Sequence, residues 1–260
     1  MNDGSHSASI GLLTPEWPVP PNVRAAFTLR SGGVSEPPFD TLNLGAHVGD
    51  DARAVARNRR LLSDALRLPA EPVWMEQVHG IEVLDLDQPS SAGQAASITG
   101  ADAAFTRREG NVCVVQVADC LPVLLSARDG SVVAVAHAGW RGLATGVLEA
   151  TVLRLAIEPR ELIAWLGPAI GPAHFEVGDE VRRAFLAHDA AASSAFIANA
   201  RGRWQCDLAA LARARLAALG ITAVFGGNWC TYADASRFFS YRRDGRCGRM
   251  AALVWREDSP

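Results

Sequence analysis

Three largely apolar runs, separated by turns of only a few residues, constrain the fold of this chain most. The runs span 112–117, 122–127 and 131–136. Runs of this length between turn residues are typical of buried β-strands. Asp129-Gly130, between the second and third runs, is a hairpin signal, so we expect these two runs to pair antiparallel.

Helical and strand-like segments alternate irregularly around these runs. Helices are predicted at 51–68, 143–155, 178–188 and 207–220. Further strands are predicted at 23–30, 72–78, 81–87, 161–167, 222–227 and 250–255. This mixture predicts an α+β (mixed α/β) fold, a single domain of mixed, largely antiparallel sheets packed with helices. We place a loose N-terminal segment at 1–22 and the catalytic domain at 23–260, because no repeat or long linker divides the chain.

Length and charge limit the classes of partner. A chain of 260 residues can bury a large core. Its net charge of −3 gives no electrostatic reason to expect nucleic acid or an anionic membrane as partner. No apolar stretch is long enough to span a bilayer, and the first ten residues lack the layout of a signal peptide. Five widely spaced cysteines without a CxxC pair suit a reducing compartment. We therefore expect a cytoplasmic protein, either a monomer or a small homo-oligomer.

The segment VAVAHAGWRG (133–142) delivers a histidine to the end of an apolar strand. His137 follows four small apolar residues, and the chain then turns at Gly139 and Gly142. Taken alone, this pattern is equally that of a hydrogen-bonded core histidine beside a packing turn.

Two other metal-ligating side chains occupy comparable positions. His79 ends the predicted strand 72–78, and Cys120 lies in the turn between the first two apolar runs. Two histidines and a cysteine form a three-ligand set that suits zinc and leaves a fourth position open. Their spacing matches no local metal motif, so two alternatives stay open. His79 could be a histidine of a surface turn, and Cys120 could be a small buried hydrophobic residue.

A set of short strings distributed along the chain is more specific. They are RSGGVS (30–35), TLNLGAHVGDD (41–51), EQVHG (76–80), ADCLPVLL (118–125), AHAGWRG (136–142), GPAIGPAHFEVGDEV (167–181) and SYRRDG (240–245). Together they closely resemble the bacterial laccase-domain (YfiH-type) family, also called polyphenol oxidase or multicopper polyphenol oxidoreductase. The resemblance covers about residues 23 to 255. It implies a fold grouped with the deamidase domain of cytotoxic necrotizing factors, and a catalytic zinc on His79, Cys120 and His137.

The resemblance also implies purine nucleoside chemistry. Family members are described as phosphorolysing adenosine, inosine, guanosine and methylthioadenosine to the base and ribose 1-phosphate, and as deaminating adenosine. A metal that activates water suits attack on C6 of adenine. Deamination also needs a proton shuttle, for which we prefer Asp102 to Asp119, although Asp102 could equally cap a turn. The predicted catalytic residues are thus Cys120, His137 and Asp102.

Phosphorolysis needs a cationic site for phosphate. Arg30 and Arg141 each lie beside flexible backbone N–H groups, a combination that binds anions, although each could also be an exposed surface arginine. Asn43, a polar residue between two leucines, is predicted to bind the nucleoside. Arg242 and Arg243 are expected to be exposed or structural.

Three other functions remain open. A copper-dependent polyphenol oxidase agrees with the older family name, but six histidines are too few for a multicopper relay, so only a single copper ion could replace zinc. Cys120 could instead be a thiolate nucleophile activated by His137. Such a Cys–His hydrolase would suit related proteins described as peptidoglycan-editing factors, which clear mis-made cell-wall precursors. A binding module without catalysis is least favoured, because it gains nothing from an open metal position.

Overall fold

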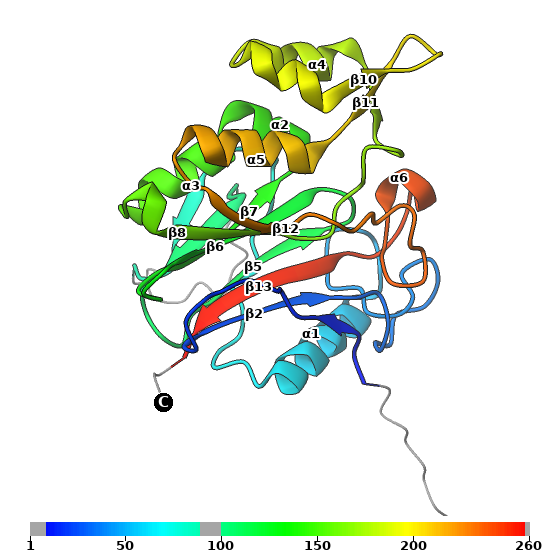
Figure 1. The fold of residues 1–260 in the computed structure, drawn as a ribbon. Helices are drawn as coiled ribbons and strands as arrows, with labels where there is room; N and C mark the ends of the chain where they lie inside the picture. The colour runs from blue at the N-terminus through cyan, green and yellow to red at the C-terminus, as the bar shows by residue number, and fades with distance from the viewer. Residues whose placement is uncertain (1–8, 89–99, 258–260) are drawn as a thin grey trace, which may run out of the picture.

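Two sheets stacked face to face form the centre of the protein (Figure 1). The computed structural model describes residues 9–88 and 100–257. The four-stranded sheet has the order β1 (Leu12–Leu13), β2 (Val23–Thr28), β13 (Met250–Arg256), β5 (Val112–Val117). The six-stranded sheet has the order β12 (Ala223–Gly226), β8 (Leu162–Leu166), β6 (Leu121–Ala127), β7 (Val133–Ala138), β4 (Ala103–Thr106), β3 (Val83–Asp85). Only β12–β8 and β3–β4 are parallel among the pairs of these sheets, so the expected α+β fold with largely antiparallel sheets is confirmed.

Burial on both faces explains why the central strands are continuously apolar. Val133 and Val135 of β7 pack between the two sheets, where Leu124 of β6 joins them. Val123 and Leu125 of β6 point the other way, into the core beneath the helices. Because side chains alternate between the faces of a strand, a strand buried on both faces must be apolar at every position.

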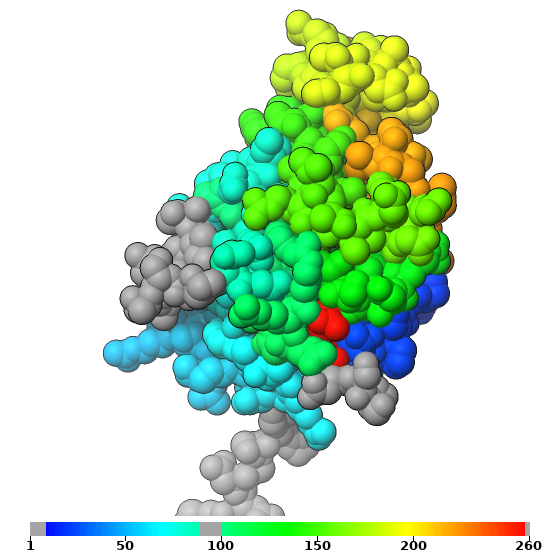
Figure 2. Space-filling model, turned by 90° about the vertical axis from the view of Figure 1, so that its left-hand side faces the viewer, coloured from blue at the N-terminus to red at the C-terminus, as the bar shows by residue number. Residues whose placement is uncertain are grey.

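Helices cover the outer faces of both sheets (Figure 1). The helices α2 (Trp140–Thr145), α3 (Val147–Leu155) and α5 (Leu208–Ala218) lie over the six-stranded sheet, and α1 (Ala52–Leu66) covers the four-stranded sheet. The helix α4 (Asp179–Leu186) joins a small sheet of order β10 (Phe196–Ala198), β11 (Trp204–Cys206), β9 (Glu176–Val177), and this part protrudes at one end in yellow (Figure 2). The short elements α6 (Tyr241–Asp244), η1 (Pro159–Glu161) and η2 (Ala190–Ala195) complete the order. Within the described ranges, no helix is both long enough and apolar enough to cross a bilayer.

Comparison with the predicted elements shows one confirmed hairpin and several differences, among them the short strands β9, β10 and β11, which were not predicted. The strands β6 and β7 pair antiparallel as expected. The predicted helix 143–155 starts earlier, at Trp140, and is divided at Gly146, whose φ is 107°. The segment 72–78 forms no ladder strand, because the side chain of Gln77 bonds the backbone of Gln116 instead. The short strand β4 was not anticipated, since AAFT has too little β-propensity to stand out.

The chain packs against the core before residue 23, where the loose N-terminal segment was predicted to end. Leu12–Leu13 pairs with β2, and Leu13, Trp17 and Val19 pack against the core between the sheets. Residues 1–8 lie outside the described part of the chain.

Candidate metal centre and active-site cavity

A cavity of about 500 Å³ lies where the two sheets meet the loops at one end. Its lining comes from the loop before α1, the loop before β3, the β5–β6 connection, β7, α2, the loop before β9, and the region from α6 to β13. The lining residues are His47, Gln77, His79, Gln116, Val117, Ala118, Asp119, Cys120, His137, Trp140, Arg141, Ile170, Phe175, Leu208, Tyr241, Arg242 and Arg249. The three predicted metal ligands are all among them.

The three ligand atoms of His79, Cys120 and His137 lie within 4.8 Å of one another. His79 Nε2 lies 3.8 Å from Cys120 Sγ, and the two imidazole rings meet edge to face with centroids 4.7 Å apart. His137 is held in β7 opposite Pro122 of β6, whereas His79 is on a loop with a φ of 62°. The fold therefore brings together side chains that are 41 and 17 positions apart in the sequence.

The glycines of the AGWRG turn allow this close approach. A Cβ on Gly139 would lie 2.9 Å from His79 Cδ2 and 3.1 Å from Cys120 Sγ. A Cβ on Gly142 would lie 2.9 Å from the carbonyl oxygen of Gly80. The two 2.9 Å contacts are shorter than a Cβ tolerates without movement of its neighbours. The turn after His137 therefore needs glycine at both positions to let the His79 loop pack on it.

Asp102 lies behind the metal ligands and is completely buried. Its carboxylate accepts hydrogen bonds from the backbone N–H groups of Val78 (3.1 Å), His79 (2.9 Å) and Gly80 (2.7 Å). It also accepts one from His137 Nδ1 at 2.8 Å. Burial would raise the pKa of Asp102, but the hydrogen bonds from His137 and from the Gly80 and His79 backbone lower it.

This arrangement does not agree with the predicted role of Asp102 as a proton shuttle. Its carboxylate has four donors, and it is absent from the cavity lining. Asp102 instead accepts hydrogen bonds from the His137 ring and from the backbone of the loop that carries His79. The alternative shuttle, Asp119, does line the cavity, but its two oxygens accept from Thr231 Oγ1 at 2.6 Å and the Arg242 N–H at 2.7 Å.

The donor set fits a zinc ion. Because Nδ1 of His137 is bonded to Asp102, Nε2 is the ring nitrogen left to bind a metal, an arrangement typical of metal-binding histidines. Ligand atoms around a tetrahedral zinc are roughly 3.3–3.8 Å apart, so separations below 4.8 Å need only small side-chain movements. Burial would raise the pKa of Cys120, but the charge of His137 and the hydrogen bonds from His137 and His79 lower it, which favours the thiolate that metals bind.

Two of the predicted binding residues lie outside the cavity lining. The guanidinium of Arg30 donates to the carbonyl oxygens of Asp40 (3.2 Å) and Ala235 (3.0 Å), so it connects two loops and does not face the cavity. Asn43 is completely buried and bonds Gly45 in both directions, at 3.1 and 2.9 Å. Of the two, Asn43 supports the cavity wall, because it accepts from the backbone N–H of the lining residue Arg249 at 2.8 Å.

Two arginines of the cavity lining differ in the role that the sequence predicted for them. Arg141, predicted to bind an anion, does line the cavity, with its guanidinium 4.4 Å from the Trp140 ring centroid. Arg242, expected to be exposed or structural, also lines it and lies 5.2 Å from the Phe175 ring centroid. The backbone N–H of Arg242 donates to the Asp119 carboxylate, which fixes the position of Arg242 beside the cavity. The two residues are 123 positions apart in the sequence, so only the folded chain reveals this contact.

Further polar residues of the lining carried no recognisable signal in the sequence. Arg249 donates to the carbonyl oxygens of Cys247 (2.9 Å) and Gly248 (3.1 Å) through one terminal nitrogen. His47 lies nearby, and burial followed by the charge of Arg249 lowers its pKa, which favours the neutral imidazole. These side chains come from segments about 200 positions apart, so no local motif joins them.

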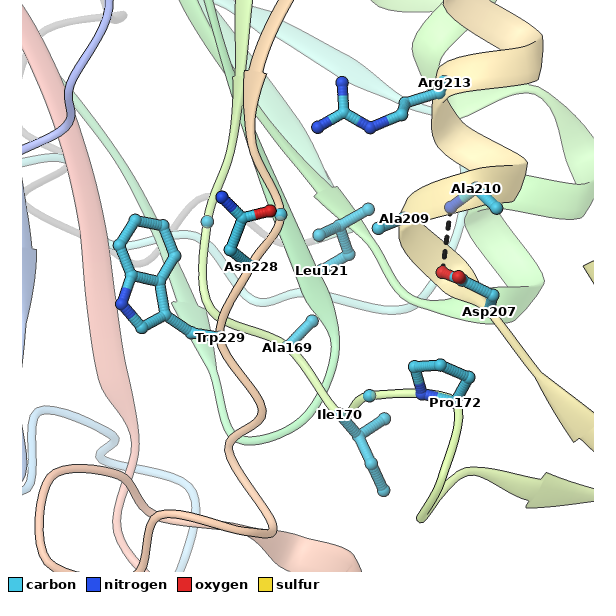
Figure 3. A pocket seen from close by; sticks show the side chains of 13 residues that line it. Leu121, Ala169, Ile170, Pro172, Asp207, Ala209, Ala210, Arg213, Asn228 and Trp229 are labelled. Carbon is cyan, nitrogen blue, oxygen red and sulfur yellow. Dashed lines mark hydrogen bonds between the residues drawn. The ribbon is translucent and has the colours of Figure 1, made fainter.

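A second cavity of about 200 Å³ lies beside the first residues of α5 (Figure 3). Its charged groups already have partners: Asp207 accepts from the Ala210 N–H at 2.9 Å, and Arg213 donates to the carbonyl oxygens of Val224 and Gly226. Its lining contains none of the three metal ligands. The chemistry is therefore concentrated in the larger cavity.

Comparison with known proteins identifies the family. Residues 24–257 match the family described as multi-copper polyphenol oxidoreductase laccase. This chain belongs to that family. A Pseudomonas aeruginosa member named purine nucleoside phosphorylase is 56% identical, with 95% of this chain and 98% of that protein covered. The Escherichia coli member named purine nucleoside phosphorylase YfiH is 52% identical, with 94% and 98% covered.

Solved structures of this laccase family share the fold. A Neisseria meningitidis protein aligns with a TM-score of 0.89 at 43% identity, covering 95% of this chain and 99% of that one. The YfiH protein of Bacillus licheniformis aligns with a TM-score of 0.84 at 31% identity, covering 90% and 93%. The family assignment suggested by the short sequence strings is therefore confirmed.

Proposed function

We propose that this member of the laccase family is a zinc-dependent purine nucleoside phosphorylase with adenosine deaminase activity. The observation that carries the proposal is the group of His79, Cys120 and His137 in a cavity that also presents arginines and aromatic rings. The names of the Pseudomonas and Escherichia relatives, at 56% and 52% identity, support phosphorolysis of purine nucleosides. Cytoplasmic location and small nucleosides as partners are part of the same proposal.

Each part of the cavity has a task in this reaction. His79, Cys120 and His137 would hold the zinc ion, while Asp102 orients the His137 ring and holds the backbone of His79. When bound, zinc supplies a Lewis acid that polarises an oxygen or activates water. The cavity's arginines can bind phosphate through charge-assisted hydrogen bonds, and its aromatic rings can contact a purine; these residues are Arg141, Arg242, Arg249, Trp140 and Phe175.

Zinc is proposed in preference to copper because of the ligand number. The described residues contain one group of three such ligands, formed by His79, Cys120 and His137. A multicopper oxidase transfers electrons between several metal centres, whereas a single centre with an open position suits hydrolytic or group-transfer chemistry. Metal analysis of the purified protein, with zinc expected at one ion per chain, tests this choice.

Cleavage of inosine should depend on phosphate. We expect the zinc-loaded protein to release hypoxanthine and ribose 1-phosphate when phosphate is present, and neither product in a phosphate-free buffer. Chromatography of the products measures both. Hypoxanthine released at equal rates without phosphate would contradict phosphorolysis.

Adenosine incubated without phosphate should yield inosine, and absence of that product would remove the deaminase half of the proposal.

Replacing Arg141 with alanine should raise the KM for phosphate by about tenfold or more, since a charge-assisted hydrogen bond is lost. We expect kcat at saturating phosphate to change less, because Arg141 is not one of the three metal ligands. Initial-rate kinetics at varied phosphate measure both constants. Arg160→Ala is the matched control, since Arg160 is exposed and remote from the cavity. An unchanged KM for phosphate would assign phosphate to Arg242 or Arg249 instead.

A second candidate function has its own observation. Asp102, His137 and Cys120 follow one another as the acid, base and thiol of a cysteine hydrolase would, and the pKa of Cys120 is lowered while that of His137 is raised. For His137, burial would lower the pKa, but the neighbouring Cys120 and Asp102 raise it. If the protein is such a hydrolase, acting on peptidoglycan precursors, its activity should survive chelation and be lost on thiol alkylation. The zinc-dependent phosphorylase predicts loss of activity in both treatments.

A further inference from the structure

Neither predicted carboxylate is free to act as the proton shuttle that deamination needs. Asp102 is completely buried and lies outside the cavity lining, and each of its oxygens accepts two hydrogen bonds. Asp119 lines the cavity, but it is 8% exposed and each of its oxygens accepts one hydrogen bond, from Thr231 or from Arg242. Another group in the cavity must therefore carry the protons.

Within the described part of the chain, two other titratable side chains line the cavity besides Asp119, the metal ligands and the arginines. They are His47, on the loop before α1, and Tyr241, at the start of α6. Imidazole is the side chain whose ordinary pKa lies nearest to neutral, and it is the group that most often transfers protons in active sites. His47 is therefore the first candidate for the shuttle.

The His47 ring differs from the other histidines of the cavity in its hydrogen bonding. The rings of His79 and His137 contact Cys120 Sγ and Asp102 Oδ1. His47 is accessible at the cavity wall, and no group in residues 9–88 and 100–257 forms a hydrogen bond or an ion pair with its ring. Both ring nitrogens of His47 therefore remain available to a molecule in the cavity.

The loop that carries His47 is anchored on both sides of this residue. Two positions before it, Gly45 exchanges two hydrogen bonds with the buried side chain of Asn43, at 3.1 and 2.9 Å. Two positions after it, the carbonyl oxygen of Gly49 accepts from Arg246 at 2.8 Å. These bonds fix the backbone around His47, so the ring starts from a defined position at the cavity wall.

The surroundings of the ring favour its neutral form. Burial and the charges of Arg249 and Arg59 lower the pKa of His47, Glu76 raises it, and the charge of His137 lowers it again. A neutral imidazole has one nitrogen that accepts a proton and one that donates. Such a ring can take a proton from water and return it to a substrate.

We propose that His47 is the catalytic residue that transfers protons during deamination of adenosine. This inference rests on the deaminase half of the proposed function. As the oxygen of water bonds to C6, one water proton passes through His47 to N1 of the purine. The proton of the resulting hydroxyl group then passes through His47 to the amino group at C6. The C6–N bond breaks, ammonia leaves, and inosine remains in its keto form with His47 unchanged.

The test compares two reactions in the same variant. We expect kcat for adenosine deamination to fall by about 100-fold or more in His47→Gln, because a glutamine amide does not transfer protons near neutral pH. Phosphorolysis of inosine should change by less than about threefold, since phosphate attacks as an anion and no water has to lose a proton. Zinc content should equal that of the wild type, because His47 is not one of the three metal ligands.

Chemical rescue distinguishes proton transfer from a structural role. His47→Ala leaves space for a free imidazole, which should restore deamination by about tenfold or more, whereas the side chain in His47→Gln fills that space and should prevent rescue. The wild type with the same imidazole shows whether imidazole competes for the metal. His188→Gln is the matched control, since His188 is exposed and lies outside the cavity lining, and it should behave as the wild type.

Two outcomes would overturn the inference alone. Deamination at the wild-type rate in His47→Gln would show that His47 transfers no proton. Equal losses of deamination and phosphorolysis in both variants, without rescue by imidazole, would show that His47 only supports the cavity wall. A wild-type protein that releases no inosine from adenosine would overturn the deaminase half of the proposed function and this inference with it.

Discussion

Replacing Cys120 with alanine is expected to remove the bound zinc and to lower kcat/KM for inosine by more than about 100-fold. Replacing a residue that merely hydrogen-bonds to a metal ligand already costs up to about 100-fold in affinity or activity, and loss of a ligand itself should cost more. Cys120 supplies the only sulfur among the three ligand atoms that lie within 4.8 Å of one another. The two remaining imidazoles cannot by themselves complete the three-ligand set that a catalytic zinc site uses. Metal analysis and steady-state kinetics on the same preparation measure the two losses together.

Cys230→Ala is the matched control for this prediction. Cys230 is also partly buried and also faces a histidine, with its sulfur 3.5 Å from His174 Nδ1. It lies outside the group of three ligands and outside the lining of the larger cavity. We therefore expect zinc content and kcat/KM to stay near the wild-type values. A Cys120→Ala protein that keeps one zinc per chain would show that the metal centre is wrongly assigned.

Asp102→Asn is expected to destabilise the protein and to weaken zinc binding. The change removes the charge that accepts four hydrogen bonds and turns an amide N–H₂ toward donors, at a cost of roughly 3 kcal/mol in the free energy of unfolding. Because Asp102 orients the ring of His137 and holds the backbone of His79, we also expect zinc affinity to fall by about 10–100-fold. Denaturant unfolding and competition with a chelating dye measure the two effects.

The effect of Asp102→Asn on stability should depend on pH in one direction. The pKa of Asp102 is lower in the folded protein than in the unfolded chain, where it is about 3.9. The stability contributed by its ionised form is thus fully present above that unfolded value and is lost as the pH falls through the folded one. Below about pH 5, the difference between wild type and variant should shrink as the pH falls. Asp129→Asn should show a much smaller difference, because the Asp129 carboxylate is exposed and accepts from the backbone N–H of Ser131 at a turn. A difference that grows toward acid would mean that Asp102 is protonated in the folded protein.

The three candidate metal ligands each stand at the boundary of a strongly patterned segment, which drew attention to them, but only the family resemblance joined them into one site. His137 follows a continuous apolar strand, and Cys120 lies in the short turn between two more. Such boundaries are visible because β6 and β7 are buried on both faces, which makes their sequences apolar at every position. The segment ending in His79 was recognised as well, although it is held by Gln77 and Asp102 and not by a ladder.

The roles of residues behind and around the ligands could not be derived in the same way. Asp102 and Asn43 are polar residues in apolar surroundings, a pattern shared by residues that touch a ligand and residues that support the wall. Arg30 and Arg141 both lie beside glycines, yet only Arg141 lines the cavity. The direction of a long side chain depends on partners far away in the chain, so spacing alone does not decide it.

The sequence by itself determined the buried strands, the β6–β7 hairpin and the family, because these depend on local periodicity, turn residues and strings of neighbouring residues. Only the tertiary structure decided that Asp102 bonds the His137 ring and the His79 backbone together. It also brought Arg249 and His47 together from opposite ends of the chain. These features depend on how the two sheets stack and where their connecting loops meet. Long-range packing of that kind leaves no periodic trace in the sequence.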